Sequence, residues 1–200
     1  MKAVGITQRV TVVPRYGERR DCLDQAWARF LSACNLLPIM LPNVPEVTLS
    51  LCESLPLAGY ILTGGNDVQA LGGDAPERDA SENALLDLAE RQNRPVLGVC
   101  RGMQVIQQRH AIPLRRVEGH VAARLTIRIN GEPTEINSYH NFGAMGSRPP
   151  LDVWASAEDG VVKAIRHSND RVIGIMWHPE RFDPFRSDDI GLVRRIFGVN

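Results

Sequence analysis

The stretch "RPVLGVCRGMQ", residues 94–104, decides the fold of this chain. The apolar run before its cysteine predicts a buried β-strand, and "RGMQVIQQRH" (101–110) predicts the helix that follows. Cys100 stands at the junction, with Gly98 and Gly102 two positions away on either side. A free cysteine is commonly a buried packing residue. A strand-to-helix turn with small neighbours is also the setting of a catalytic nucleophile, and we favour that interpretation for Cys100.

The first half of the chain repeats this alternation of strand and helix. We expect strands at 2–7, 37–43 and 57–65, and helices at 20–37 and 81–92. A polar loop at 64–80 would lead into the second helix, with Ser81 as its N-cap. The strands are apolar throughout rather than at every second position, which is typical of a parallel sheet covered on both faces.

The pattern changes near residue 120. Five segments with polar turns between them predict antiparallel strands at 124–130, 133–140, 151–159, 161–168 and 171–178, and a helix at 188–199 closes the chain. We therefore expect a single α/β domain over residues 1–200. It would have three layers in a flavodoxin-like arrangement, with a mostly parallel central sheet and a β-rich C-terminal half.

Composition limits the classes of function. The chain has 200 residues, 44% of them hydrophobic, and Lys+Arg 23 balance Asp+Glu 23, so it predicts neither a nucleic-acid nor a membrane partner. Lys2 and Lys163 are its two lysines, which is typical of a coding bias toward arginine. The four cysteines show no metal-ligand spacing, so we expect no metal, and free thiols in a cytoplasmic protein. Packing is the expected role of three of them, Cys22, Cys34 and Cys52.

Three predicted strands end in chemically reactive or glycine-rich segments: "TGGND", "GVCRG" and "WHPE". At a helix N-terminus the Cys100 thiolate is favoured, and the backbone N–H of Arg101 can stabilise an oxyanion. Pro179 favours an extended His178, so that His178 and Glu180 would face the same side of the strand. A cysteine, an imidazole and a carboxylate in this order are a catalytic triad. Gly64 and Gly65 form either an ordinary turn or the second half of the oxyanion hole.

The motifs "TGGND", "GVCRGMQ", "NSYH" and "WHPE" together resemble the class I glutamine amidotransferase family, including its free-standing γ-glutamyl hydrolases, the C26 peptidase group. The resemblance covers nearly the whole chain. It implies that Cys100 is the nucleophile, His178 the base and Glu180 its orienting partner, with Gly65 and Arg101 as oxyanion donors. It also implies that the substrate's γ-glutamyl group contacts Gly64, Gln104, Ser138, Tyr139 and His140.

The N-terminal segment "GITQRV…YGERRDCLDQAWARFL" is similar to a subgroup, the γ-glutamyl-CDP-amidate hydrolases, which serve surface-polysaccharide phosphoramidate decoration. That resemblance implies a nucleotide-linked small-molecule substrate. We expect no cofactor, and a homodimer is a possible assembly. Arg15, Arg19 and Arg20, in the loop expected after the first strand, would then bind the diphosphate or simply lie in solvent. The segment 105–120 lacks the family's usual glycine pair, which leaves the role of His120 open.

Three functions remain open at this stage. The chain could cleave γ-glutamyl-CDP-amidate or another γ-glutamyl amine such as γ-glutamyl-GABA through a γ-glutamyl thioester. It could be the glutaminase subunit of a separate synthase, to which it would pass ammonia. It could also be a metabolite-binding regulator in which Cys100 senses oxidation, although the complete set of Cys100, His178 and Glu180 disfavours this.

Overall fold

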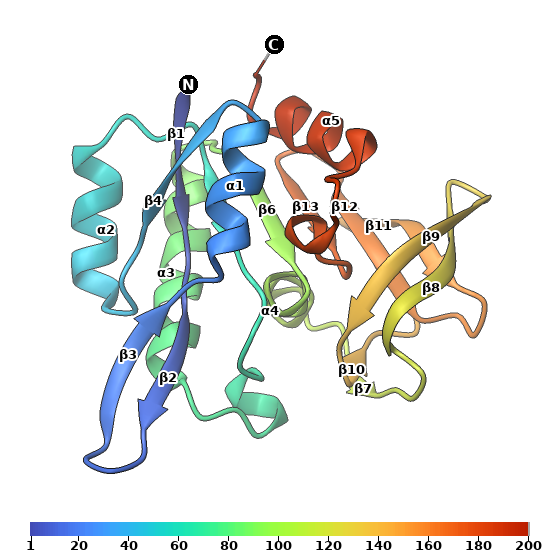
Figure 1. Cartoon of the computed structure of the whole chain (residues 1–200), viewed down its shortest axis with the longest axis horizontal. Coiled ribbons are helices and arrows are strands. Elements are labelled where there is room, and N and C mark those ends of the chain that lie inside the picture. The colour runs from blue at the N-terminus through green and yellow to red at the C-terminus, as the bar shows by residue number, and fades with distance from the viewer. Residues whose placement is uncertain (200) are drawn as a thin grey trace.

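A nine-stranded sheet forms the centre of the protein in the computed structural model, which describes residues 1–199 (Figure 1). The strand order is β4-β1-β5-β6-β13-β12-β11-β8-β9. The strands from β4 to β13 are mutually parallel, and those from β13 to β9 pair antiparallel. In that order the bounds are Leu36–Met40, Lys2–Ile6, Tyr60–Leu62, Val96–Val99, Val172–Ile175, Val162–His167, Leu151–Ala157, Val121–Ile129 and Glu132–Tyr139.

Helices cover both faces of the parallel part of the sheet. The first apolar cluster joins α1 (Gln25–Ala33) and α5 (Ser187–Ile196) to one face, which is turned toward the viewer in Figure 1. The second cluster joins α2 (Pro45–Ser54), α3 (Pro76–Arg91) and α4 (Arg101–Arg109) to the other face. The three-layer α/β fold with a parallel centre and a β-rich second half is therefore confirmed.

The apolar strands explain this layering. All residues of β5 and β6 are buried. Successive side chains of a strand point to opposite faces, so Leu97 of β6 packs in the α1/α5 layer while Val96 packs in the α3/α4 layer. A strand covered on both sides has no solvent face, and polar residues are absent from it.

The helix predicted at 20–37 begins later than the sequence analysis expected. Residues 9–22 form a separate hairpin of β2 (Arg9–Val13) and β3 (Glu18–Cys22), and α1 starts at Gln25. The side chain of Asp24 caps α1 by accepting a hydrogen bond from the Ala26 N–H at 2.9 Å. The expected loop after the first strand is therefore wrong, because most of that segment lies in a two-stranded ribbon.

The predicted loop at 64–80 is also shorter than expected. It contains the 3₁₀ turn η1 (Gln69–Leu71), and α3 already begins at Pro76. Proline is suited to the first turn of a helix because it lacks an N–H group that would have no partner there. Ser81 lies buried inside α3 and is not its N-cap, and the sequence analysis missed α2 altogether.

The strand at 171–178 was expected to be antiparallel, but β13 is antiparallel only to β12. On its other side it pairs in parallel with β6, with Gly174 opposite Gly98 and Ile175 opposite Val99. The carboxyl ends of β6 and β13 thus meet at one edge of the sheet, followed by Cys100 and by the 3₁₀ turn η2 (Pro179–Arg181). A small ribbon of β7 (Arg115–Arg116) and β10 (Phe142–Gly143) lies beside β8 and β9 (Figure 1). No helix within residues 1–199 is long and apolar enough to cross a membrane.

Candidate active site

Cys100 occupies a strained turn between β6 and α4. Its backbone angles are φ 53° and ψ −104°, a conformation that side-chain-bearing residues rarely adopt. The Cys100 N–H donates to the carbonyl of Ile175 in β13 at 2.7 Å, which fixes the turn to the neighbouring strand. A non-glycine residue held in this way at a strand end is the geometry of a nucleophile elbow.

The two glycines near Cys100 allow close packing of the turn. A Cβ atom at Gly98 would lie 2.7 Å from the backbone of Gly102, and one at Gly102 would lie 2.1 Å from the carbonyl oxygen of Leu62 in β5. Neither position tolerates a side chain, because α4 packs directly on the sheet there. The small neighbours of Cys100 thus allow the close approach of α4 to the strands.

His178 and Glu180 lie beside the elbow. A hydrogen bond of 2.7 Å joins His178 Nδ1 to Glu180 Oε1, and both side chains are buried. A Cβ atom at Gly64 would lie 2.7 Å from His178 Cε1 and 3.5 Å from Cys100 Cβ, so Gly64 borders both side chains. His178 is extended as expected, but Glu180 reaches it through the 3₁₀ turn η2 rather than along a continuing strand.

Asn137 in β9 fixes the backbone of the histidine. Its side-chain Nδ2 donates to the His178 carbonyl, and its Oδ1 accepts from the His178 N–H, both at 2.8 Å. The sequence analysis quoted "NSYH" without giving this asparagine a role. The strand does not alternate, since Ile136, Asn137 and Ser138 are all buried, so its pattern gave no signal for this role.

The histidine is electrostatically tuned toward its charged form. Burial opposes the charge, but hydrogen bonds to Cys100 and Glu180 and the charges of both outweigh it and raise the pKa of His178 to about 9. An imidazolium is therefore the form of His178 present at neutral pH.

The expected oxyanion donors lie on the two adjacent strand ends. Gly65 has φ +83°, which favours glycine, and within residues 1–199 its N–H donates no hydrogen bond. Arg101 is the first residue of α4, where backbone N–H groups have no partner inside the helix. Two free N–H groups beside a cysteine can stabilise a tetrahedral oxyanion.

A buried ionic network lies behind these donors. Arg78 of α3 donates to the carbonyls of Gly65 and Thr63, the latter at 2.7 Å, and pairs with Glu82 at 3.0 Å. The Arg101 side chain pairs with Glu82 and with Asp79 of the same helix. Burial opposes ionisation of Glu82, but the charges of Arg101 and Arg78 outweigh it and lower its pKa.

The sequence analysis missed this network because it considered only the backbone of Arg101. Arg78 and Glu82 are four residues apart in a segment that it took partly as loop. Once α3 is known to begin at Pro76, this spacing places both side chains on one helix face. The network joins the two strand ends that carry Gly65 and Arg101.

The "NSYH" residues and Gln104 surround the same corner of the sheet. Ser138 and His140 are buried, whereas Tyr139 is half-exposed and meets the His178 ring edge-on, with centroids 5.9 Å apart. Gln104, one helical turn after Cys100, donates from Nε2 to the carbonyl of Phe142 at 2.8 Å. Of the expected γ-glutamyl contacts, the structure places Gly64 beside Cys100, Tyr139 against His178 and Gln104 one helical turn after Cys100.

A cavity of about 340 Å³ opens beside His178 and Glu180. Its lining includes Gly64, Gly65, His178 and Glu180 together with two arginines, Arg9 of β2 and Arg181 of η2. The arginines proposed from the sequence are not part of this lining. Arg19 pairs with Glu77 and the carbonyl of Asp74, and Arg20 pairs with Glu18.

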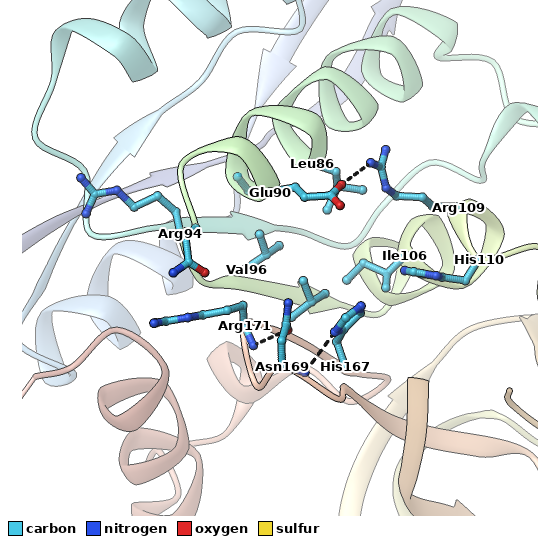
Figure 2. A pocket seen from close by; sticks show the side chains of 13 residues that line it. Leu86, Glu90, Arg94, Val96, Ile106, Arg109, His110, His167, Asn169 and Arg171 are labelled. Carbon is cyan, nitrogen blue, oxygen red and sulfur yellow. Dashed lines mark hydrogen bonds and ion pairs between the residues drawn. The ribbon is translucent and has the colours of Figure 1, made fainter. Parts of the chain in front are cut away.

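A second cavity, of about 110 Å³, lies at the opposite ends of β6 and β13 (Figure 2). Several of its polar groups are already paired: Arg109 with Glu90, and His167 with the Asn169 N–H. The Arg94 and Arg171 side chains extend away from His110 and His167 in Figure 2. The cavity therefore lacks polar groups that converge on one point, and the site beside Cys100 is the candidate active site.

The fold is that of the class I glutamine amidotransferases. The glutaminase domain of Trypanosoma brucei CTPS superimposes over 100% of this chain and 95% of its own, with a TM-score of 0.72 and 12% sequence identity. The sequence profile of the family described as Peptidase C26 matches residues 2–112 and 107–180. The chain belongs to this peptidase C26 family.

Two curated relatives illustrate its range. A "Gamma-glutamyl-CDP-amidate hydrolase" of Campylobacter jejuni is 30% identical over 89% of this chain and 90% of its own. A "Gamma-glutamyl-gamma-aminobutyrate hydrolase" of Escherichia coli O157:H7 is 26% identical over 90% of this chain and 85% of its own. This range supports a γ-glutamyl hydrolase or amidotransferase-like enzyme that acts on a small molecule.

Proposed function

We propose that this protein hydrolyses γ-glutamyl-CDP-amidate to cytidine diphosphoramidate and glutamate, using Cys100 as nucleophile. The observation that carries the proposal is the cavity in which His178 and Glu180 share a lining with Arg9 and Arg181. Arginine guanidinium groups form bidentate pairs with phosphate. The similarity to the Campylobacter jejuni enzyme over nearly the whole chain supports the same substrate.

The reaction proceeds in two steps. The Cys100 thiolate attacks the γ-carbonyl carbon, and the Gly65 and Arg101 N–H groups stabilise the oxyanion. The His178 imidazolium protonates the departing nitrogen as the carbon–nitrogen bond breaks, which leaves a γ-glutamyl thioester. His178, now neutral, accepts a proton from water, and the resulting attack releases glutamate and the thiolate. Glu180 orients the imidazole and stabilises its charge throughout.

The two arginines would recognise the leaving group rather than the γ-glutamyl group. The side-chain carbons of Arg9 pack over Gly65, since a Cβ atom there would lie 3.1 Å from Arg9 Cδ. Arg181 lies over the Tyr139 ring, 5.0 Å from its centroid. Both cations therefore flank the turn that holds the carbonyl under attack, where a phosphoramidate on the departing nitrogen would emerge.

The test is turnover on a panel of γ-glutamyl-CDP-amidate, γ-glutamyl-GABA and glutamine, measured as glutamate release. We expect a clear preference for the nucleotide substrate, and no turnover of any substrate by Cys100→Ala. Equal activity on glutamine would contradict the nucleotide assignment and favour a general glutaminase. Activity that rises with an added synthase would favour the ammonia-donating role.

The arginine assignment has its own prediction. Arg9→Gln and Arg181→Gln should each raise KM for γ-glutamyl-CDP-amidate about tenfold, equivalent to about 1.4 kcal/mol of lost binding. Glutamine hydrolysis should change little in Arg9→Gln, because glutamine carries no phosphate. Arg181 Nε also lies 3.6 Å from Glu180 Oε1, so Arg181→Gln should lower glutamine hydrolysis as well, but less than it lowers turnover of the nucleotide substrate. Arg171→Gln, an exposed arginine at the second cavity, is the matched control. An equal loss on every substrate would indicate a structural role, and Arg19→Gln and Arg20→Gln test the arginines proposed from the sequence.

A further inference from the structure

Hairpin β2–β3 contacts the candidate site through one cross-strand pair, Arg9 and Cys22. Both residues line the cavity of about 340 Å³, and Arg9 Nε donates to Cys22 Sγ at 3.4 Å. In residues 1–199 the two terminal nitrogens of Arg9 donate no hydrogen bond, whereas Arg19 and Arg20 of the same hairpin pair with carboxylates. A guanidinium with free terminal nitrogens matches the geometry of a phosphate group.

The next residue of β2, Val10, is bonded to the glycine turn after β5. Its N–H donates to Asn66 Oδ1 at 2.8 Å, and its carbonyl accepts from Asn66 Nδ2 at 2.9 Å. One side-chain amide thus holds both polar groups of one backbone residue, which we call the Asn66–Val10 clamp. Asn137 holds His178 in the same way. The backbone beside Arg9 is therefore fixed relative to the turn.

The turn end of the clamp belongs to the buried network of α3. Asn66 follows Gly65 directly, and the buried Arg78 donates to the Gly65 carbonyl and, at 3.4 Å, to Asn66 Oδ1. The side-chain carbons of Arg9 pack over Gly65 from the other side. Asn66 therefore connects the strand that carries Arg9 to the arginine that holds the candidate oxyanion turn.

The second strand of the hairpin is anchored at the same level. Asp21 lies opposite Val10 in the ladder, and its carboxylate accepts from the Asn43 N–H at 2.8 Å and from Asn43 Nδ2 at 2.6 Å. The same Nδ2 donates to the carbonyl of Gln8 at 3.1 Å, and Asn43 is buried. The base of the hairpin is thus held on both strands, which keeps Arg9 and the turn in one arrangement.

The backbone of Asn66 alone does not account for these bonds. Its φ is 51°, a left-handed conformation that asparagine tolerates in turns. Asn130, in the turn between β8 and β9, has φ 50° and is exposed to solvent. A turn conformation therefore needs no partner for the side chain, whereas Asn66 bonds to a residue 56 positions away.

We propose that hairpin β2–β3 is the element of this site that selects the leaving group, and that Asn66 is the positioning residue that fixes Arg9 over the oxyanion turn. The inference rests on the proposed nucleotide substrate, whose phosphate Arg9 would bind. It deepens that function by naming the contact that aligns the bound leaving group with the carbonyl under attack.

The first test is a double-mutant cycle. Asn66→Gly removes the side-chain amide and tolerates the backbone conformation of the turn. We expect KM for γ-glutamyl-CDP-amidate to rise about tenfold, as in Arg9→Gln, because both changes weaken the same contact with phosphate. In Arg9→Gln/Asn66→Gly the rise should remain about tenfold, whereas independent effects would multiply to about a hundredfold. Glutamine hydrolysis should change little in Asn66→Gly, because Arg78 still holds the Gly65 carbonyl.

A second measurement examines the clamp without any substrate. The Val10 N–H donates to Asn66 Oδ1, so its hydrogen exchange, followed by NMR, should be about tenfold faster in Asn66→Gly than in the wild type. Asn130→Gly is the matched control, since it replaces an asparagine with nearly the same φ in a different hairpin. It should change neither KM nor the exchange of Val10.

The outcomes separate the inference from the proposed function. Unchanged Val10 exchange, or a rise in KM that multiplies in the double variant, would overturn the inference and leave the proposed function intact. An equal loss of turnover on glutamine and on the nucleotide would also overturn it, because Asn66 would then serve the oxyanion turn alone. A wild-type protein that hydrolyses glutamine but not γ-glutamyl-CDP-amidate would instead contradict the proposed function, and Val10 exchange would still decide whether the clamp exists.

Discussion

Close packing around single residues shapes the candidate site. Cys100 is strained, Gly98 and Gly102 are required by contacts with backbone, and Gly64 lies against the histidine. Strain of this kind persists only where the surrounding structure holds it. Here the hydrogen bond from the Cys100 N–H to Ile175 and the packing of α4 on β5 provide that support.

Gly64→Ala tests the importance of this packing. The added Cβ would lie 2.7 Å from His178 Cε1, so the imidazole must shift from its position beside Gly64. We expect kcat to fall on the order of a hundredfold with little loss of thermal stability, since misplacement of about 1 Å has that effect. Gly146→Ala, where nothing lies within 4 Å of the added atom, should retain full activity. Equal kcat in the two variants would contradict the placement of His178.

The pH dependence follows from the raised pKa of His178. Activity that needs the imidazolium should persist to about pH 9 and fall above it. Glu180→Gln removes a charge and a hydrogen bond that favour the imidazolium, so the basic limb of kcat/KM should move to lower pH. The raised pKa also stabilises the fold below about 6.5, and that contribution disappears as the pH rises through about 9. A basic limb that stays in place in Glu180→Gln would argue against the His178–Glu180 coupling.

Sequence reasoning could propose only candidate site residues whose neighbours in the chain carry the signal. Cys100 between two glycines, and His178 two positions before Glu180, are visible in a single stretch of sequence. The contacts of Asn137 with His178 and of Arg78 with Gly65 were not predicted, because the partners are 41 and 13 positions away. Their roles depend on which strands are neighbours, and the sequence alone leaves that open.

At the scale of elements, α3 supports the candidate oxyanion site from behind. Its Arg78, Asp79 and Glu82 connect the turn after β5 to the first residue of α4. Glu82 is a buried carboxylate shared by Arg78 and Arg101. Its removal would leave these two buried cations without that counter-charge. The helix thus links two strand ends that must keep a fixed separation.

Glu82→Gln measures the contribution of this element. We expect the free energy of unfolding to fall by about 3–5 kcal/mol, because Arg78 and Arg101 lose a buried counter-ion. Glu90→Gln, on the same helix, removes an exposed carboxylate that pairs with Arg109, and should cost less than about 1 kcal/mol. Urea denaturation followed by circular dichroism provides both values. Similar losses in the two variants would show that the buried network contributes no more than a surface pair.

Sequence reasoning misplaced α1 and missed hairpin β2–β3 because the local patterns there are ambiguous. The 20–37 segment has apolar residues at helical spacing, and Cys22 fits that spacing although it lies on β3. The cap at Asp24 and the proline at 76 are the local signals that mark the true starts of α1 and α3, and neither was used in the prediction. Hairpin β2–β3 is half-exposed and pairs only with itself, so its sequence carries little of the alternation that a buried face imposes.

At the scale of the molecule, the site unites the two halves of the chain. Cys100 and the glycine turn come from the first half, and His178, Glu180 and the "NSYH" segment come from the second. The β6–β13 pairing joins them, and it is parallel, so both strands deliver their residues to the same edge. If the two halves unfolded separately, the site would be lost as soon as either half unfolded.

Residues 1–200 should therefore unfold as one domain, and hydrogen exchange can test this. Under conditions where exchange reports opening free energies, the slowest amides of β5 and β6 should match those of β12 and β13. These four strands are central, and β6 and β13 share a register of four residue pairs. Hairpin β2–β3 and the outer strand β9 should open at lower cost, since each has one edge without a strand neighbour. A markedly lower opening free energy for β12–β13 than for β5–β6 would instead show that the second half unfolds by itself, and Cys100 would then lose its histidine in a partly folded protein.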